Sequence, residues 1–380
     1  MYWLIIPVAV YSIGLFALWL LFGRNNSQAG TVGKGTARVS VVVAARNEEK
    51  NITALLKGLA GQDYPHGLLE IVVVNDGSTD RTPIVISEFI SDALLCSRID
   101  ISLINNPFAG KKGAIRYGIG KATGELILTT DADCEVGPGW VSAFAGCYAA
   151  TGNDMILGEV YQKPAGGIVS QFGRFEFSAL QGITEAAVAA GWPVMCNGAN
   201  MGFLRDVYMR HCGELRDELP SGDDMFLMHA VSRGGGRIGY AGSSAATVVT
   251  APAVTAAALL RQRARWASKA YYYSDRATFT LAAATVACNA AVTAAALISI
   301  FKPEYLILTA LLYAIRFMPD LLMTRHNIKK RENRFPLLLF LLSELVYPFY
   351  FMTIAFMSLF PSSRSFAQRS EGPKSKDPRA

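Results

Sequence analysis

Apolar runs of bilayer length stand at both ends of the sequence, and they constrain the fold more than any other feature. Residues 2–22 are uncharged and apolar, and three further runs follow at 278–301, 305–323 and 335–360. A membrane-spanning helix needs about 20 such residues. Only 17% of the chain is charged, whereas a soluble domain usually has roughly 25%. Part of this chain is therefore predicted to lie in lipid.

Composition divides the chain into five segments. We expect a transmembrane helix over 1–23, a linker rich in Gly, Ser, Thr and Asn over 24–37, and a cytoplasmic domain over 38–275. A membrane region of two or three spans follows over 276–360, and a disordered tail over 361–380.

Basic residues beside the apolar runs predict the orientation in the membrane. Arg24 follows the first run, and a strongly basic stretch at 325–334 separates the last two. The positive-inside rule places both in the cytoplasm, so the domain should face inward from the cytoplasmic membrane. Three spans after the domain would put the basic tail outside. The run at 305–323 contains Arg316 and Asp320, so it either spans the membrane or is re-entrant or interfacial.

The net charge of +6 does not indicate a nucleic-acid partner, because the basic residues cluster beside apolar runs and form no stripe on a domain. Six scattered cysteines form no C-x-x-C pair and no metal-ligand spacing. We expect reduced thiols, as in the cytosol.

From residue 39 short apolar segments alternate with helical patterns. This alternation predicts an α/β domain with a mostly parallel sheet and helices on both faces. Ligands of such sheets bind beyond the carboxyl ends of the strands. The expected strands are 39–45, 70–74, 101–104 and 126–129, and the expected helices are 48–59, 82–90 and 112–121.

Polar clusters follow three of these strands. Residues 46–49 (Arg-Asn-Glu-Glu) follow the first, and residues 75–80 (Asn-Asp-Gly-Ser-Thr-Asp) follow the second. The second cluster can present a carboxylate to a base or ribose hydroxyl, or simply cap a helix. Asp131 and Asp133 follow the fourth strand, where two carboxylates repel each other unless a cation is near. They predict either a Mg²⁺ or Mn²⁺ site on a diphosphate, which we favour, or a hydrated turn.

Two later clusters also allow both a functional and a purely structural interpretation. Asp223 and Asp224 precede a helical run, where a carboxylate serves as a general base or as a helix cap. Arg265 offers planar donors suited to phosphate oxygens. The neighbouring Trp266 belongs either to the same site or to a membrane-boundary anchor.

In this order the clusters resemble family 2 glycosyltransferases, specifically the membrane-integrated branch with cellulose, hyaluronan and poly-N-acetylglucosamine synthases. The resemblance covers about residues 38–275 and implies a GT-A fold with transmembrane helices at both ends. It is carried by Arg46-Asn47-Glu48, Asp76-Gly77-Ser78, Asp131-Ala132-Asp133, Gly222-Asp223-Asp224 and Gln262-x-x-Arg265-Trp266.

The resemblance also implies roles for individual residues. Asp224 would be the catalytic base, and Asp131 and Asp133 would hold Mg²⁺ or Mn²⁺. Donor-binding residues would be Arg46, Glu48, Asp76, Lys112, Asp131, Gln262, Arg265 and Trp266. Acceptor-binding residues would be Cys196, Asn197, Gly198, Asn200 and Asp223.

The implied function is an inverting transfer of a sugar from a nucleotide-diphosphate donor, with a UDP-sugar preferred, to a hydroxyl of a lipid or glycan acceptor. A processive polysaccharide synthase is the alternative, although those enzymes tend to have more spans than this chain offers. An inactive scaffold is a distant third possibility. Residues 172–190 would form a helix that either brings a lipid acceptor to the cleft or only packs there.

Overall fold

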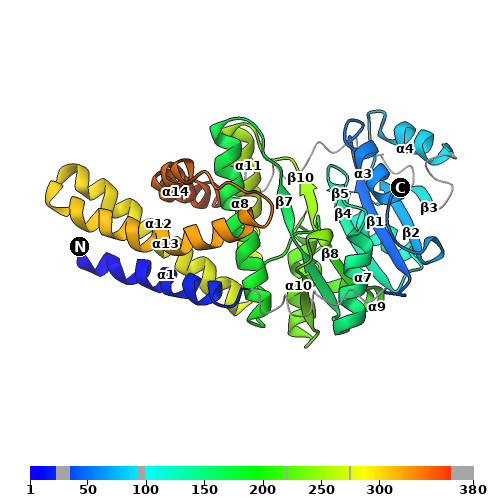
Figure 1. Cartoon of the computed structure of the whole chain (residues 1–380), viewed down its shortest axis with the longest axis horizontal. Coiled ribbons are helices and arrows are strands. Elements are labelled where there is room, and N and C mark those ends of the chain that lie inside the picture. The colour runs from blue at the N-terminus through cyan, green and yellow to red at the C-terminus, as the bar shows by residue number, and fades with distance from the viewer. Residues whose placement is uncertain (23–34, 93–98, 109, 220, 274, 361–380) are drawn as a thin grey trace, which may run out of the picture.

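The computed structural model describes residues 1–22, 35–92, 99–108, 110–219, 221–273 and 275–360. Most of the predicted linker and the whole predicted tail lie outside these ranges. Figure 1 shows two parts side by side, an α/β domain and a bundle of long helices that contains the N-terminus. The apolar ends of the sequence therefore come together into one helical part.

A seven-stranded sheet forms the centre of the domain, in the order β3-β2-β1-β4-β8-β6-β9. β1 pairs in parallel with β2 and β4, and β2 pairs in parallel with β3, whereas β8 is antiparallel to both β4 and β6. The mostly parallel α/β sheet predicted from the sequence is confirmed. The strands are β1 Val39–Ala45, β2 Leu69–Asn75, β3 Asp100–Asn105, β4 Leu126–Asp131, β6 Met155–Gly158, β8 Met201–Leu204 and β9 Ile238–Ala241.

Helices cover both faces of this sheet because its strands are apolar on both sides. Along β1, Val41 and Val43 pack into one core with α3 and α7, and Val42 packs into the other with α6. Deleting such fully buried side chains typically costs about 2–5 kcal/mol each. The covering helices are α3 Ile52–Ala60, α4 Thr82–Ser91, α6 Gly110–Lys121, α7 Trp140–Thr151, α9 Arg205–His211 and α10 Asp223–Arg233.

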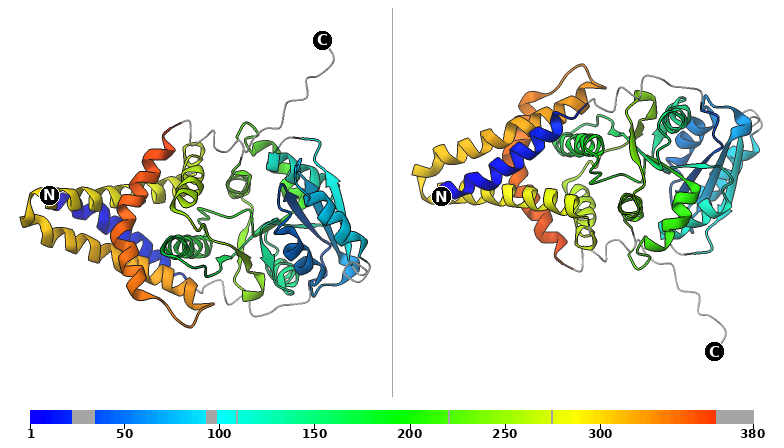
Figure 2. Two further views of the ribbon diagram at one scale, coloured as in Figure 1. Left: turned by 90° about the horizontal axis from the view of Figure 1, so that it is seen from above. Right: turned by 90° about the horizontal axis from the view of Figure 1, so that it is seen from below.

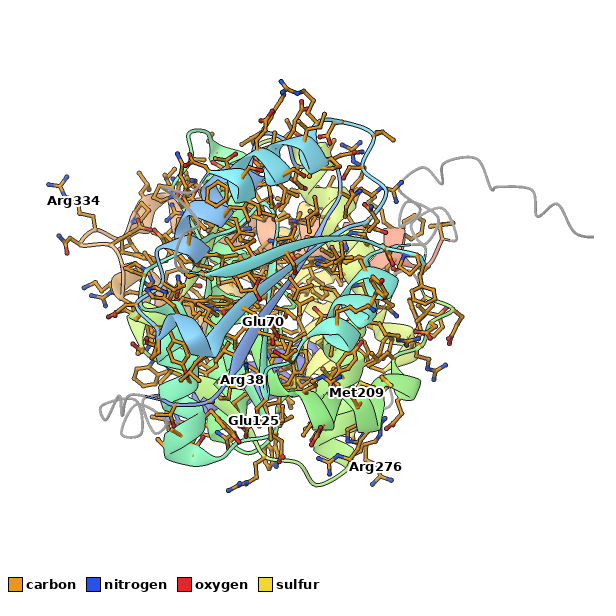
Figure 3. The ribbon with its side chains drawn as sticks, turned by 90° about the vertical axis from the view of Figure 1, so that its right-hand side faces the viewer. Arg38, Glu70, Glu125, Met209, Arg276 and Arg334 are labelled. Atoms are coloured by element: carbon orange, nitrogen blue, oxygen red, sulfur yellow. The ribbon has the colours of Figure 1, made fainter. Side chains whose placement is uncertain are left out.

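The edge where the strands end carries the polar clusters. Seen from the domain end, Arg38, Glu70 and Glu125 lie close together where β1, β2 and β4 begin (Figure 3). The clusters lie at the opposite edge. A small sheet of β5 Glu135–Val136, β10 Val248–Thr250 and β7 Val160–Gln162 adjoins them.

Two helices lie between the domain and the bundle. α8 (Ile168–Ala189) packs on α1 and α13 on one side and on β7 and β9 on the other. α11 (Ala256–Ala267) packs on α8 and on α14. The helix expected over 172–190 is thus confirmed as a helix, and it joins the two parts of the molecule.

Four helices in the described part of the chain are long and apolar enough to cross a membrane. α1 (Ile5–Trp19), α12 (Arg276–Phe301) and α13 (Leu306–Lys329) run side by side along the bundle (Figure 1). α14 (Leu337–Ser358) crosses these three at a steep angle (Figure 2) and packs on α11 and α12. Its orientation therefore differs from that of the other three helices.

The charged run at 305–323 is part of one continuous helix, α13, although the sequence made it a candidate for a re-entrant segment. Arg316 is only 1% exposed and forms ion pairs with Asp320 and with Glu344 of α14. Because side chains of opposite charge inside the bundle form ion pairs with Arg316, α13 remains helical through this charged segment. The helix that lies across the bundle is α14 instead.

The end of α13 is tied to the domain by ion pairs. Lys330 Nζ lies 2.5 Å from Glu185 Oε2 on α8, and Arg331 Nη2 lies 2.9 Å from Glu159 Oε2. Arg174 of α8 pairs with Glu332. Residues 325–329 of the basic stretch are thus part of α13, and residues 330–332 pair with Glu185, Glu159 and Arg174.

Candidate active site

A cavity of about 2470 Å³ lies where the strand ends face the helical bundle. Fourteen of the fifteen residues predicted for the site line it; Asn200 does not. Its walls also include residues of α1, α8, α12, α13 and α14. The strand-end clusters, the start of α10 and the α11 motif, which lie far apart in the sequence, therefore share one space with the helical bundle.

The first two polar clusters are bonded to each other. Asn47 has a left-handed backbone with φ of 57°, and its side-chain oxygen accepts a hydrogen bond from the Thr79 amide at 2.8 Å. The Glu48 amide donates to Thr82 Oγ1 at 2.7 Å. Asparagine adopts a left-handed backbone more readily than other non-glycine residues, and these hydrogen bonds hold the two polar clusters together.

Asp76 directly follows β2 and is 7% exposed. Its Oδ1 accepts a hydrogen bond from Asn106 Nδ2 at 2.8 Å, which holds the carboxylate in place. Asn106 also accepts from the Phe108 amide at 3.0 Å. The turn after β3 thus orients the Asp76 carboxylate, which lines the cavity with Arg46 and Glu48.

The lysines at the start of α6 have different partners. Lys111 Nζ contacts the Asp131 carboxylate directly. Desolvation acts to lower the pKa of Lys111, but the carboxylates of Asp131 and Asp223 outweigh it and raise that pKa. Lys112, the residue that we predicted to approach a donor, also lines the cavity, but its ammonium donates to the carbonyl oxygens of Leu215 and Arg216 at 2.7 and 2.8 Å.

Asp131 ends β4, and Asp133 lies two residues on, in the same cavity wall. Withdrawal from water raises the pKa of Asp133, and the negative charge of Asp131 adds to this shift. A raised carboxyl pKa beside a second carboxylate is the environment that a divalent cation relieves. Among the described residues no group of three or more metal-ligating side chains occurs, so a cation would need oxygens from a ligand to complete its coordination.

Asp223 and Asp224 are the first two residues of α10, and Gly222 is its N-cap. Gly222 has φ of +96°, and an added Cβ would lie 3.0 Å from Lys269 Cδ, so glycine is required there. Asp224 Oδ2 accepts from the Gly198 amide at 3.0 Å. Its Oδ1 accepts from the Met225 amide in the first turn of α10 at 2.9 Å, so the Asp224 carboxylate binds both the start of the helix and the loop at 196–200.

Withdrawal from water raises the pKa of Asp223, and the adjacent Asp224 raises it further. Lys269 also lines the cavity, and burial lowers its pKa although Asp224 acts in the opposite direction. The acidic start of α10 is thus faced by a basic residue that sequence analysis did not single out.

The predicted acceptor loop is only partly exposed to the cavity. Cys196, Asn197 and Gly198 line it, and Asn197 Oδ1 accepts from the Ala199 amide at 3.0 Å. Asn200 is 1% exposed and lies outside the lining. Its amide nitrogen donates to the Glu159 and Ala246 carbonyls at 2.6 and 2.8 Å, and its oxygen accepts from Trp140 Nε1 at 2.9 Å. These bonds fix the loop from behind, so the structure gives Asn200 a supporting position.

Gln262, Arg265 and Trp266 lie on α11 and line the cavity. Arg263, between them, is buried and was not predicted. Its Nη1 donates to Gln262 Oε1 at 2.6 Å, and its guanidinium lies 4.3 Å from the centre of the Trp266 ring.

Arg263 is held in turn by Glu176 of α8 at 2.8 Å. Tyr350 of α14 donates to the same carboxylate at 3.0 Å. This network connects the α11 motif to the crossing helix α14. The position of Arg263 inside the motif was a signal in the sequence, but its burial and its partner Glu176 could be identified only from the fold.

Comparisons with known proteins indicate which family of proteins the domain is similar to. Residues 40–212 match the family model of glycosyl transferase family 2. The match includes the three clusters at the strand ends and stops before α10 and α11. The chain is 33% identical to the beta-monoglucosyldiacylglycerol synthase of Nostoc sp. (strain PCC 7120) over 126 residues, which are 33% of this chain and 26% of that protein.

It is also 31% identical to the probable glycosyltransferase YdaM of Bacillus subtilis (strain 168) over 159 residues, 42% of this chain and 35% of that protein. The chain thus aligns with about a quarter to a third of the length of these relatives. A mannosyltransferase of Pyrobaculum calidifontis, solved with GDP-Man and Mn²⁺, superposes with a TM-score of 0.51 at 20% identity, covering 86% of this chain and 100% of that one. This likeness concerns the fold, which is GT-A-like as predicted.

Proposed function

We propose that this protein is a membrane-bound, inverting glycosyltransferase that moves a sugar from a nucleoside-diphosphate donor, such as a UDP-sugar, to a hydroxyl of a lipid acceptor. The observation that carries the proposal is the single cavity, which joins the carboxylates of Asp131, Asp133 and Asp224 to the helical bundle. The match of residues 40–212 to the family 2 model supports the reaction class.

The donor occupies the strand-end side of the cavity. Asp76 and Glu48 meet the nucleoside hydroxyls and base edge, and Arg46 lies beside them. Lys112, Gln262, Arg265 and Trp266 face the diphosphate from α6 and α11. Lys111 joins this set because its ammonium is already at the Asp131 carboxylate. Cationic donors fixed around a leaving diphosphate stabilise the charge that develops in the transition state.

Asp131 and Asp133 are the residues that would hold Mg²⁺ or Mn²⁺. The raised pKa of Asp133 beside Asp131 fits this assignment, because a cation removes the repulsion that causes the shift. A bound divalent cation would supply charge neutralisation of the diphosphate. The Mn²⁺ present in the Pyrobaculum calidifontis neighbour agrees with this choice of metal.

Asp224 accepts the proton of the acceptor hydroxyl as that oxygen attacks the anomeric carbon. Its carboxylate lies in the cavity wall beside Cys196, Asn197 and Gly198, where an acceptor would approach. Asp223, one residue earlier, binds the acceptor. A single displacement inverts the anomeric carbon, so an α-linked donor gives a β-linked product.

The catalytic domain faces the cytoplasm in this proposal. Arg276 and Arg334 flank the domain side of α12 and α13 and project outward at the edges of the molecule (Figure 3). Basic residues at this boundary favour the cytoplasmic side of a membrane. With α14 lying across the bundle, α1, α12 and α13 are the spans, and the end of α14 returns to the domain side.

The test uses purified full-length protein, a panel of nucleotide sugars, Mn²⁺, and membrane lipid extract present or absent. We expect one nucleotide sugar to transfer a single sugar to a lipid-phase product, and chelation to stop the transfer. Products of increasing chain length would show the polysaccharide synthase instead. Absence of turnover with every donor would refute the proposal in favour of a scaffold.

A further inference from the structure

Three ionisable side chains and a tyrosine meet inside the helical bundle. Arg316 Nη2 lies 3.1 Å from Asp320 Oδ2, and Arg316 Nη1 lies 3.0 Å from Glu344 Oε2. Tyr11 donates a hydrogen bond to Asp320 Oδ1 at 2.6 Å. The four residues come from α1, α13 and α14, and we call them the bundle cluster.

The bundle cluster is costly for a membrane helix to contain. Arg316, Asp320 and Glu344 are at most 9% exposed. Even a paired buried ion is rarely more stable than an apolar side chain of the same size. Ionisable residues inside membrane segments usually mark a binding site or a pathway. Stability alone therefore gives no reason for three of them here.

The bundle cluster also lines the cavity that contains Asp224. Asp320 lies nine residues before the end of α13, which is about 14 Å into the bundle at the usual rise per residue. The cavity lining on α12 and α14 also includes apolar side chains, among them Phe279, Val286 and Phe351. A cavity with both polar and apolar lining suits a molecule with both characters.

The outer surface of α14 shows how such a molecule would reach the cavity. Leu338, Leu342 and Leu345 are 70%, 52% and 54% exposed and lie outside the cavity lining, so apolar side chains project away from the bundle. A helix that lies across the spans with this surface fits the boundary between headgroups and acyl chains. Residues of the same helix, among them Glu344 and Phe351, line the cavity. A lipid at α14 is therefore adjacent to the cavity that leads to Asp224.

The charges of the bundle cluster select among lipids. Among the cavity-lining residues of α1, α12, α13 and α14 that the structure describes, one guanidinium faces two carboxylates. An anionic headgroup would add a third negative charge in a medium of low dielectric constant. Hydroxyl groups, in contrast, donate to carboxylate oxygens. Arg316 Nε has no hydrogen-bond partner among the described residues and can donate to an ester carbonyl.

We propose that the bundle cluster binds uncharged polar groups of the acceptor lipid other than its reacting hydroxyl, and that this lipid is a neutral glycoside of diacylglycerol, which has further hydroxyls and ester carbonyls. This inference rests on the proposed transfer to a lipid and specifies which lipid. The carboxylates of Asp320 and Glu344 accept from its non-reacting hydroxyls, Arg316 donates to an ester carbonyl oxygen, and the reacting hydroxyl lies at Asp224.

The test compares Glu344→Gln and Tyr11→Phe in the full-length protein, with Glu304→Gln as the matched control. Glu304 is exposed in the turn between α12 and α13 and lies outside the cavity lining. Each protein is placed in phosphatidylcholine nanodiscs that contain dioleoylglycerol, monoglucosyl-dioleoylglycerol or a polyprenyl phosphate. The Michaelis constants for acceptor and donor are measured separately, together with the thermal midpoint.

We expect transfer to monoglucosyl-dioleoylglycerol, less transfer to dioleoylglycerol because it has no second hydroxyl for the cluster, and none to the polyprenyl phosphate. In Glu344→Gln and Tyr11→Phe the acceptor KM should rise about tenfold, the effect of losing one hydrogen bond to a charged group. The donor KM should stay unchanged, because neither residue is near the diphosphate side. Glu304→Gln should match the wild type in both constants.

Native mass spectrometry gives a second measurement that does not depend on turnover. Wild-type protein should retain monoglucosyl-dioleoylglycerol through purification, and Glu344→Gln should retain less. An unchanged acceptor KM and unchanged lipid retention in both variants would make the cluster purely structural and overturn the inference while leaving the proposed function intact. Preferred use of the polyprenyl phosphate would likewise overturn it. A wild type without turnover of any nucleotide sugar would refute the proposed function itself.

Discussion

Replacing Asp224 with asparagine separates catalysis from structural support. Asp224 Oδ2 accepts from the Gly198 amide at 3.0 Å, and Oδ1 accepts from the Met225 amide at 2.9 Å. Asparagine keeps one acceptor oxygen and loses the charge. As the general base, Asp224 should contribute about 10²–10⁴ to the rate, so Asp224→Asn should raise the barrier by about 2.7–5.4 kcal/mol.

The structural part of the effect should be much smaller. Loss of one charge-assisted bond costs about 1–2 kcal/mol of stability, and the lost charge at the start of α10 costs about 0.3–1 kcal/mol. Asp206→Asn is the matched control. Asp206 is exposed in the first turn of α9 and lies outside the cavity lining, so this change removes the same helix charge without touching the site.

Three measurements on the two variants suffice: donor affinity by calorimetry, the thermal midpoint, and turnover with a labelled nucleotide sugar. Donor affinity should stay near the wild-type value in both variants, because the diphosphate is held from other elements. Only Asp224→Asn should lose turnover. Turnover within a few-fold of the wild type would refute the assignment and leave Asp223 as the next candidate.

Three further outcomes are expected. Mn²⁺ at a hundredfold excess over its Kd should stabilise the wild type by about 2.7 kcal/mol in thermal unfolding. Asp133→Asn should abolish this stabilisation, and a variant that is still stabilised by Mn²⁺ would contradict the metal site. Because burial and Asp224 raise the pKa of Asp223, that carboxylate destabilises the fold as pH rises through this pKa. Asp223→Asn should therefore raise the thermal midpoint at pH 8 and give no gain near pH 4, whereas a loss at pH 8 would be inconsistent with the shift. A cysteine at Asn333 should react with an impermeant maleimide only after permeabilisation, and one at Glu304 in intact cells; the reverse pattern would invert the proposed topology.

The strands and their polar ends were predictable because local pattern determines both. A buried parallel strand is apolar along its length, so the switch to polar residues at Arg46, Asp76 and Asp131 marks its end. The partner of a lysine was not predictable in the same way. Lys111 and Lys112 are adjacent on α6, and successive helical residues point in very different directions, so only the packing of α6 decides which one meets Asp131.

Two other differences between the sequence predictions and the structure also arise from packing that the sequence pattern does not show. Asn200 looked like a ligand contact from its neighbours in the sequence, but Trp140 and the Glu159 carbonyl occupy its amide in the fold. The charges in α13 looked unfavourable for a membrane span, because a sequence window includes their cost and omits Glu344, the partner on the next helix. In each case the decisive contact is distant along the chain.

The ion pairs of Lys330 with Glu185 and of Arg331 with Glu159 fix the catalytic domain to the end of a membrane helix. A domain attached in this way keeps a constant height above the bilayer, and Asp224 keeps it too. This height would then determine how far from the membrane surface an acceptor hydroxyl must lie to reach Asp224. Each sugar added moves the terminal hydroxyl farther from the membrane surface. The terminal hydroxyl of the product would therefore lie beyond Asp224, whereas that of its precursor lay at Asp224. A fixed height would thus limit the number of sugars added to each lipid.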